Sequence, residues 1–394
     1  MAKLDKRLSL LLSEPVEDAY LDCIDDLVIN ICKHLKTGKA FRTARWETEK
    51  LAELGQLTAE NAKIINRVTK NVPSLIREAL EESQKIALSD VEKMIQNAIK
   101  TGAIEAAPTD STQKVLEDLM ERAISEANLT NTTMLQSGQA AYIQAVENTV
   151  SWQNKAITDK IGILQDINTA AVSTQIHTET FNQALKRSIS QLSEKGIYGF
   201  VDKAGRHWSP EAYMSMCIRT ASHNASIDSI RAKQQDYNSD IFQISSHAGA
   251  RPLCYPYQGK FYCWGREGGT FTDGRGVRHS YKPISSTSYG EPAGIFGINC
   301  GHYPLPQIPR VSIPSDGVEQ NKEENDREYA LTQQQRALER RIRDAKRKES
   351  AFRAAGLTEE ADAQKAVIRS RQADMRAFIK NTGFKRQYDR EQIK

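Results

Sequence analysis

The stretch from Gly196 to Pro210, GIYGFVDKAGRHWSP, is where the pattern of this sequence changes. Within it, Gly199 to Trp208 has the composition of two short strands joined by a Lys-Ala-Gly turn. Ser209 then provides a helix N-cap, Pro210 suits the first helical turn, and Glu211 lies near the positive end of the helix dipole. We therefore predict a β-hairpin that leads directly into a helix.

The helix that starts at Pro210 is predicted to continue to about Gln235. Its apolar residues, which we expect to face inward, are Tyr213, Met216, Cys217, Ile227 and Ile230. A strand from Ile241 to Ser246 follows. From His247 to Pro314 the chain is rich in Gly, Pro, Tyr and Ser, so short strands, turns and ordered loops are expected. Residues 196–317 are therefore predicted to form a compact α+β domain.

On the N-terminal side, residues 1–195 have a helical pattern. Apolar residues recur at helical spacing, as at Ile157, Ile161 and Leu164, and aromatic residues are sparse. Narrow apolar stripes suit an elongated arm that packs on a partner, and they suit a plain helical bundle equally well. The prolines of this half are expected at helix starts or in links; they are Pro15, Pro73 and Pro108.

On the C-terminal side, residues 318–394 return to a helical pattern. A seven-residue repeat contains Leu331, Leu338, Ala345 and Phe352. Gly356 is a natural helix stop and Thr358 a natural restart, so this tail is predicted to be a helical hairpin. The expected fold class is mostly α, with an elongated helical N-terminal half, a compact Gly-, Tyr- and Pro-rich α+β domain, and the hairpin.

Charge is distributed unevenly along the 394 residues, whose net charge is +4. Residues 321–394 contain 19 Lys and Arg against 13 Asp and Glu, whereas the rest of the chain contains 35 against 37. A basic tail on a neutral body indicates contact with an anion, of which nucleic acid is the usual example. With 39% hydrophobic residues, the composition excludes a fully disordered chain.

The sequence shows no secretory signal and no stretch near the ~20 apolar residues that a membrane span needs. We therefore expect a soluble, intracellular protein without membrane contact during assembly. Its six cysteines should then be reduced unless they bind a metal.

A run of basic residues in the first tail helix is the candidate for DNA contact. It consists of Arg340, Arg341, Arg343, Lys346, Arg347 and Lys348. On the outside of the helix, such a cluster would neutralise phosphates without reading sequence. Glu339, Asp344 and Glu349 interleave with it, so a solvated face that only keeps the hairpin soluble is the alternative.

The segment 254–263, CYPYQGKFYC, is nearly symmetric about Gln258-Gly259. A two-residue hairpin turn there would place Cys254 opposite Cys263 as a closely approaching pair. Cys300 and His302 add two further donors, and three thiolates with one imidazole suit tetrahedral zinc. The alternatives are cysteines that pack as small hydrophobes, with no cofactor, or a disulfide.

An enzymatic pocket is the other possibility for the central region. The groups available are His247, Arg251, Tyr289, Glu291 and His302, which together would suit a nuclease or a nucleotide-acting enzyme. The sequence does not fix their mutual geometry. It contains no P-loop, zinc-protease helix motif, nucleophile elbow or dinucleotide fingerprint. We therefore expect no enzymatic activity, with a toxin-like nuclease as the alternative.

The central motifs resemble the phage minor capsid protein 2 family. They are SHAGARP at 246–252, YQGK at 257–260 and SYGEPAGIFGINCGH at 288–302. Three upstream segments fit the same family, namely FVDKAGR at 200–206, Arg219-Thr220 and WETEKLAELG at 46–55. The resemblance covers roughly residues 1–380. The family is also distantly similar to Mu F-type head-morphogenesis proteins, which often end this region in a Cys-x-His-like element, as in Cys300 to His302.

The resemblance implies a portal-associated minor head protein that acts in head morphogenesis and in DNA packaging or ejection. Its expected partners are the portal protein, the capsid and non-specific double-stranded DNA, with residues 1–195 as the candidate portal-binding part. It implies location in the virion head near the portal, and in the host cytoplasm during assembly. The motif residues expected to be structural are Gly249, Arg251, Pro252, Gln258, Gly259, Tyr289, Gly290, Glu291, Pro292, Gly297, Asn299, Cys300 and His302. Family members commonly carry Ser-His where this chain has Leu253-Cys254, which argues against Cys254 as a shared ligand.

Overall fold

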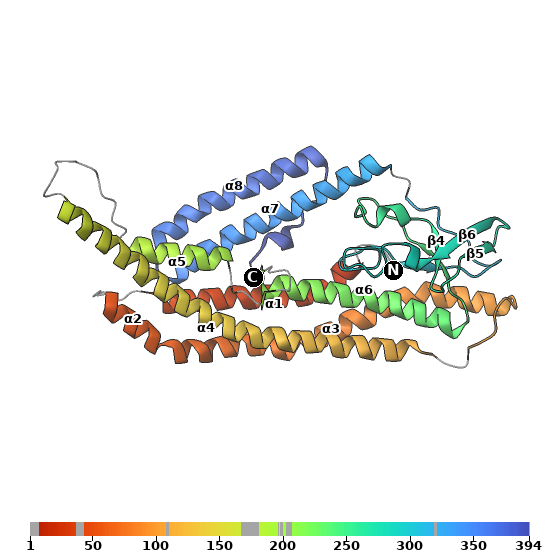
Figure 1. Cartoon of the computed structure of the whole chain (residues 1–394), viewed down its shortest axis with the longest axis horizontal. Helices are drawn as coiled ribbons and strands as arrows, with labels where there is room; N and C mark the ends of the chain where they lie inside the picture. Colours follow the sequence, from red (N-terminus) through yellow and green to blue (C-terminus); the bar gives the residue numbers. More distant parts are fainter. Residues whose placement is uncertain are drawn as a thin grey trace. The chain divides into compact units, whose positions relative to one another are not determined.

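A computed structural model of the chain confirms the mostly α fold class with an α+β part (Figure 1). It describes residues 8–36, 43–107, 110–166, 181–195, 197, 200–201, 207–318 and 321–393. The helices over these residues are α1 (Leu8–His34), α2 (Thr43–Ala52), α3 (Leu54–Lys100), α4 (Thr112–Asp166), α5 (Phe181–Lys195), α6 (Pro210–Asp236), α7 (Lys322–Ala354) and α8 (Thr358–Thr382). The strands are β1 (Phe200–Val201), β2 (His207–Trp208), β3 (Ile241–Ile244), β4 (Phe261–Cys263), β5 (Gly269–Thr272), β6 (Arg278–Pro283) and β7 (Pro304–Pro306).

The chain folds into two compact units, and several long helices contribute residues to both. Unit 1 consists of Met1–Asp18, Asn71–Asn128 and Ala212–Gln334. Unit 2 consists of Ala19–Lys70, Leu129–Glu211 and Gln335–Lys394. The domain boundaries predicted near residues 195 and 317 are based on changes in composition along the sequence. They stay a prediction.

Unit 1 contains α6 and a five-stranded sheet with strand order β5-β6-β4-β3-β7. Strands β4 and β6 are parallel, and the other neighbours are antiparallel. Ile227 of α6 and Phe242 of β3 belong to a buried apolar cluster that also includes Cys254, Cys300 and Tyr303. Two of the four candidate metal ligands named from the sequence, Cys254 and Cys300, are therefore built into the core of this unit.

Unit 2 is a helical assembly with a few specific polar contacts in its interior. The Tyr142 hydroxyl of α4 donates to the Lys50 carbonyl of α2 at 2.9 Å. Thr149 of α4 and Ser188 of α5 form a buried hydroxyl pair at 2.8 Å. In Figure 1, α7 and α8 lie side by side as the predicted hairpin, and Gly356 takes a left-handed φ of 80° between them.

The structure near residues 200–210 agrees with the predicted β-hairpin that leads into a helix. Strands β1 and β2 pair antiparallel with Phe200 opposite Trp208, although the predicted turn lies outside the described residues. Helix α6 begins at Pro210 and ends at Asp236, as expected. Ile227 and Ile230 are buried on it, and β3 is two residues shorter than the predicted strand.

The expected positions of two prolines are wrong. Pro15 lies inside α1 and Pro73 inside α3, whereas Pro108 is outside the described residues. A proline inside a helix removes one backbone hydrogen bond and costs about 3 kcal/mol. The buried apolar stripe of α3, which includes Val72 and Ile76, continues past Pro73 and offsets that cost.

None of the helices in the described part of the chain has an apolar stretch long enough to cross a membrane.

Candidate metal centre

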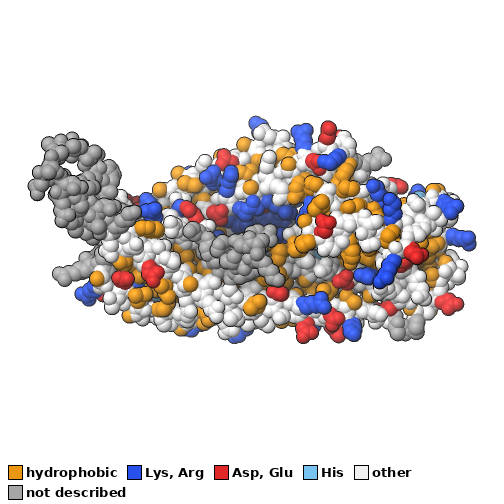
Figure 2. Space-filling model, in the orientation of Figure 1, with side chains coloured by type: hydrophobic (Ala, Val, Ile, Leu, Met, Phe, Trp, Pro, Cys, Tyr) orange, Lys and Arg blue, Asp and Glu red, His pale blue; other side chains and the backbone are white. Residues whose placement is uncertain are grey.

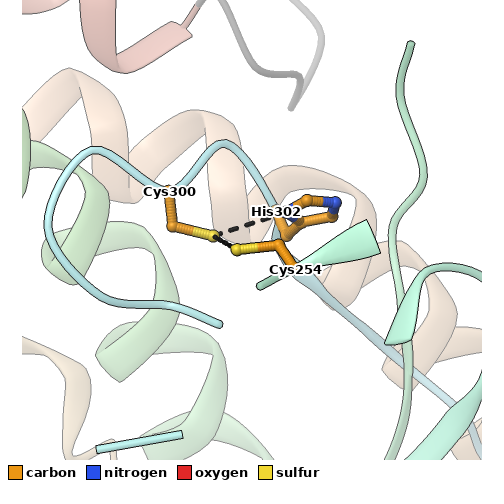
Figure 3. Close-up of side chains that lie close together, drawn as sticks. All are labelled: Cys254, Cys300 and His302. Atoms are coloured by element: carbon orange, nitrogen blue, oxygen red, sulfur yellow. Dashed lines mark hydrogen bonds between the residues drawn. The ribbon is translucent and has the colours of Figure 1, made fainter. Parts of the chain in front are cut away.

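Three side chains that sequence reasoning named as candidate metal ligands meet in the core of unit 1. Figure 3 shows Cys254, Cys300 and His302 pointing toward one another. The two sulfur atoms are 3.8 Å apart, and Cys300 Sγ is 3.4 Å from His302 Nδ1. One donor atom from each residue lies within 4.8 Å of the others, and all three residues are buried.

Cys263 is not part of this group, so the predicted pairing of Cys254 with Cys263 is wrong. Residues Tyr255–Tyr257 form a 3-10 helix in place of the first strand of the expected hairpin. A type II turn follows, in which Gln258 has a φ of −56° and Gly259 supplies the φ of 71°. Strand β4 then pairs with β3, which places Cys263 opposite Ile241. The Cys263 thiol donates to the Glu267 carbonyl at 3.1 Å.

The side chain of Gln258 fixes the tautomer of His302. Its Oε1 accepts the backbone N–H of His247 at 2.8 Å and lies 3.0 Å from His302 Nε2. Because a backbone N–H only donates, the amide oxygen must face it, and His302 must therefore be protonated at Nε2. Its Nδ1 lone pair then faces Cys300.

Hydrogen bonds with residues 251–253 and within the segment fix the path of residues 288–302. Ser288 Oγ donates to the Leu253 carbonyl and accepts the Ile295 N–H, both at 3.0 Å. The Arg251 guanidinium donates to the carbonyls of Ala293 at 2.9 Å and Ile298 at 3.0 Å. These bonds tie the loop that carries Cys300 to the segment that carries Cys254.

Small and turn-forming residues let this loop pack closely. A Cβ on Gly294 would lie 1.8 Å from the Ser288 carbonyl oxygen, and one on Gly297 would lie 2.7 Å from the Glu291 carbonyl oxygen. Asn299 has a φ of 56°, a left-handed conformation that Asn tolerates better than most residues. Gly249 and Gly290 also have positive φ, at 62° and 93°. Several motif residues thus shape the loop backbone that presents Cys300.

Four remaining motif residues, Pro252, Tyr289, Glu291 and Pro292, lie at the surface. Pro252, Glu291 and Pro292 are exposed. Tyr289 contacts Trp264 edge-on, with ring centroids 6.2 Å apart.

The protonation of the two cysteines is unequal. The hydrogen bond with the Cys254 thiol, and then the neighbouring His223, lower the pKa of Cys300 well below its ordinary range against the opposing effect of burial. The same contact with Cys300, together with burial, raises the pKa of Cys254. Cys300 is therefore the more acidic thiol of the pair.

His223 of α6 is a buried histidine close to this group that sequence reasoning missed. It is 3% exposed and packs edge-on against Tyr303 with ring centroids 4.6 Å apart. The available signal was its spacing, because His223, Ile227 and Ile230 are four and then three residues apart. That spacing places the histidine on the same buried helix face.

The residues proposed for an enzymatic pocket are mostly engaged in packing. The His247 and His302 rings lie 4.3 Å apart in a tilted arrangement. Arg251 is bound to backbone carbonyls, and Glu291 lies at the surface. Among the described residues, Arg251 is therefore engaged by backbone carbonyls and is not free to hold a phosphate beside these two histidines.

Four of the six basic tail residues have partners within unit 2. Arg347 is buried and pairs with Asp25 at 2.5 Å. Arg343 donates to the Arg390 carbonyl at 2.8 Å, Lys346 to Gln392 Oε1 at 2.6 Å, and Lys348 to Glu194 at 2.6 Å. Arg340 and Arg341 are exposed. Figure 2 shows that Lys and Arg are mixed with Asp and Glu over the visible face, with one strip of basic side chains among them.

Comparisons with known proteins place the chain among phage structural proteins. A family model described as phage minor capsid protein 2 matches residues 4–380. A structural protein of Lactococcus phage LL-H is 28% identical over 375 residues, which cover 93% of this chain and 93% of that protein. A structural protein of Lactococcus phage mv4 is 34% identical over 114 residues, which cover 29% of this chain and 92% of that protein. No solved structure matches the chain.

Proposed function

Because the chain belongs to the phage minor capsid protein 2 family, we propose that it is a non-enzymatic structural protein of the virion head that associates with the portal. The observation that carries this proposal is the family match over residues 4–380. A relative of nearly equal length, the phage LL-H protein, is named a structural protein, which supports the same role. In this proposal the protein acts in head morphogenesis and in DNA packaging or ejection, and moves from host cytoplasm to virion head.

Docking on a portal ring is supported by the helical character of the N-terminal half. Helices α3 and α4 have 47 and 55 residues, so each is roughly 70 to 80 Å long at about 1.5 Å per residue. Helices of this length offer extended surfaces to a large partner. The test is co-expression with the portal protein of the same phage, followed by affinity purification through the portal. Recovery of the chain supports the proposal, and its absence from both the portal complex and purified virions contradicts it.

Contact with DNA is the second part of the proposal and depends on fewer residues than the sequence suggests. Arg340 and Arg341 are exposed, whereas Arg347 lies in a buried ion pair. We expect weak binding to double-stranded DNA of any sequence, with an affinity that falls as salt rises because counterions are released. Fluorescence anisotropy with unrelated duplexes at low and moderate salt measures this. Binding that is absent at low salt contradicts the DNA role and leaves the capsid role standing.

A further inference from the structure

We propose that Cys254, Cys300, His302 and His223 form a tetrahedral structural site for Zn²⁺ in the core of unit 1. All four residues lie in this unit, and each is at most 5% exposed. The site has two sulfur and two nitrogen donors, the ligand set that zinc prefers in structural centres. It goes beyond the capsid role and is independent of it.

The distances among the donor atoms of Cys254, Cys300 and His302 agree with a bound zinc ion. Bond lengths of about 2.3 Å to sulfur and about 2.0 Å to nitrogen, at tetrahedral angles, place two sulfurs about 3.8 Å apart and a sulfur and a nitrogen about 3.5 Å apart. The observed separations are 3.8 Å between Cys254 and Cys300, and 3.4 Å between Cys300 Sγ and His302 Nδ1. A disulfide would need the sulfurs about 2.05 Å apart.

The hydrogen bond from His302 to Gln258 prepares His302 to bind a metal. With its proton on Nε2 and held by Gln258 Oε1 at 3.0 Å, His302 keeps an unprotonated Nδ1 toward Cys300. A ligand histidine that donates its other N–H to a fixed acceptor is the usual arrangement around zinc. Gln258 is itself fixed by the His247 N–H.

His223, which is outside the group of three whose donor atoms lie within 4.8 Å of one another, is the proposed fourth ligand. Neither of its ring nitrogens has a hydrogen-bond partner, although the residue is 3% exposed. Leaving a buried polar group unsatisfied destabilises the fold, and coordination of a metal removes that penalty. The ring packs edge-on against Tyr303, the residue that follows His302, with ring centroids 4.6 Å apart.

A zinc ion at this position would join three separate parts of unit 1. His223 belongs to α6, Cys254 precedes the first 3-10 helix, and Cys300 and His302 lie just before β7. Two thiolates neutralise the divalent charge, so the centre is compatible with apolar neighbours such as Ile227 and Phe242. With four protein ligands and no open position, the site stabilises the fold and does not catalyse a reaction.

The test is elemental analysis of the full chain, purified without chelator and without added metal. We expect about one zinc per chain for the wild type, and a large loss in Cys300→Ser and Cys254→Ser. The matched control is Cys263→Ser, which removes a buried cysteine of the same sheet outside the four ligands and should retain zinc. Circular dichroism shows whether each variant is folded.

Replacement of zinc by Co²⁺ tests the identity of the fourth ligand even when the serine variants fold poorly. The wild type should give the visible absorption of tetrahedral Co²⁺ with a thiolate charge-transfer band, and His223→Ala should alter the tetrahedral bands and weaken binding. An unchanged Co²⁺ spectrum in His223→Ala removes His223 from the site. Zinc below about a tenth of an equivalent in the wild type overturns the proposal. So does a count of two fewer free thiols than the six in the sequence, which indicates a disulfide.

Discussion

Arg347 of α7 donates a hydrogen bond of 2.5 Å from Nε to Oδ1 of Asp25 on α1, and both side chains are almost fully buried. The two residues are 322 positions apart in the chain. This pair joins the basic tail helix to the first helix within unit 2. Arg347 was predicted to contact DNA, but its charge is buried in this ion pair.

Replacing Arg347 with Ala should destabilise the protein by about 3–5 kcal/mol, because Asp25 then stays buried without its partner. Urea denaturation of the full chain, followed by circular dichroism, measures the loss. Arg341→Ala removes the same kind of side chain from an exposed position of the same helix and serves as the control. Its unfolding midpoint should stay close to that of the wild type, and equal midpoints for both variants would show that the pair contributes little.

Glu339 should make the protein less stable as the pH rises. A carboxylate whose pKa is lowered by an ion pair has the opposite effect. Burial raises its pKa, and the attraction of Arg390, Arg343 and Arg336 only partly offsets this effect. A carboxyl whose pKa is raised in the folded state holds its proton more tightly there than in the unfolded chain. Its contribution to stability therefore falls as pH rises from 4.5 through the raised folded pKa.

Glu339→Gln removes that titration. We expect the variant to be more stable than the wild type at neutral pH, and the difference to shrink as the pH falls toward 4.5. Asp389→Asn, which changes an exposed carboxylate near the end of the chain, is the control. Urea midpoints measured across this pH range decide the matter, and a difference that grows on acidification contradicts the assignment.

Gly294→Ala should damage the loop that carries Cys300. The added Cβ would lie 1.8 Å from the Ser288 carbonyl oxygen, so the backbone must move, at a cost of about 1–3 kcal/mol or more. Gly55→Ala, at a helical position with no atom within 4 Å of its Cβ, should instead be neutral or stabilise the protein by about 0.5–1 kcal/mol. Thermal unfolding of the two variants side by side checks both signs.

Arg340 and Arg341 should account for the binding of DNA by the tail. Changing both to Ala should weaken DNA binding and lower the slope of log affinity against log salt by about 0.9 for each phosphate that the variant no longer neutralises. Arg275→Ala with Arg278→Ala removes two exposed arginines from the β5–β6 region and should leave the slope unchanged. An equal effect of the two double variants would indicate that total charge, and not the position of the arginines, governs binding.

Local signals in the sequence determined the order and type of the main elements. Ser209 and Pro210 mark the start of α6, Gly356 and Thr358 mark the hairpin of α7 and α8, and helical spacing indicates the N-terminal helices. These signals act over a few residues through capping, φ preference and amphipathic spacing, so they can be read without the fold. The long motif between Ser246 and His302 determined the family in the same direct way.

The tertiary structure alone decided which distant side chains meet. Symmetry about Gln258 and Gly259 suggested Cys263 as the partner of Cys254, but a 3-10 helix replaces one strand and Cys300 takes that place. Arg347 looked like any surface arginine until its pairing with Asp25 was known. Burial and long-range pairing depend on how whole elements pack, and residue spacing within one element does not encode the identity of its partner.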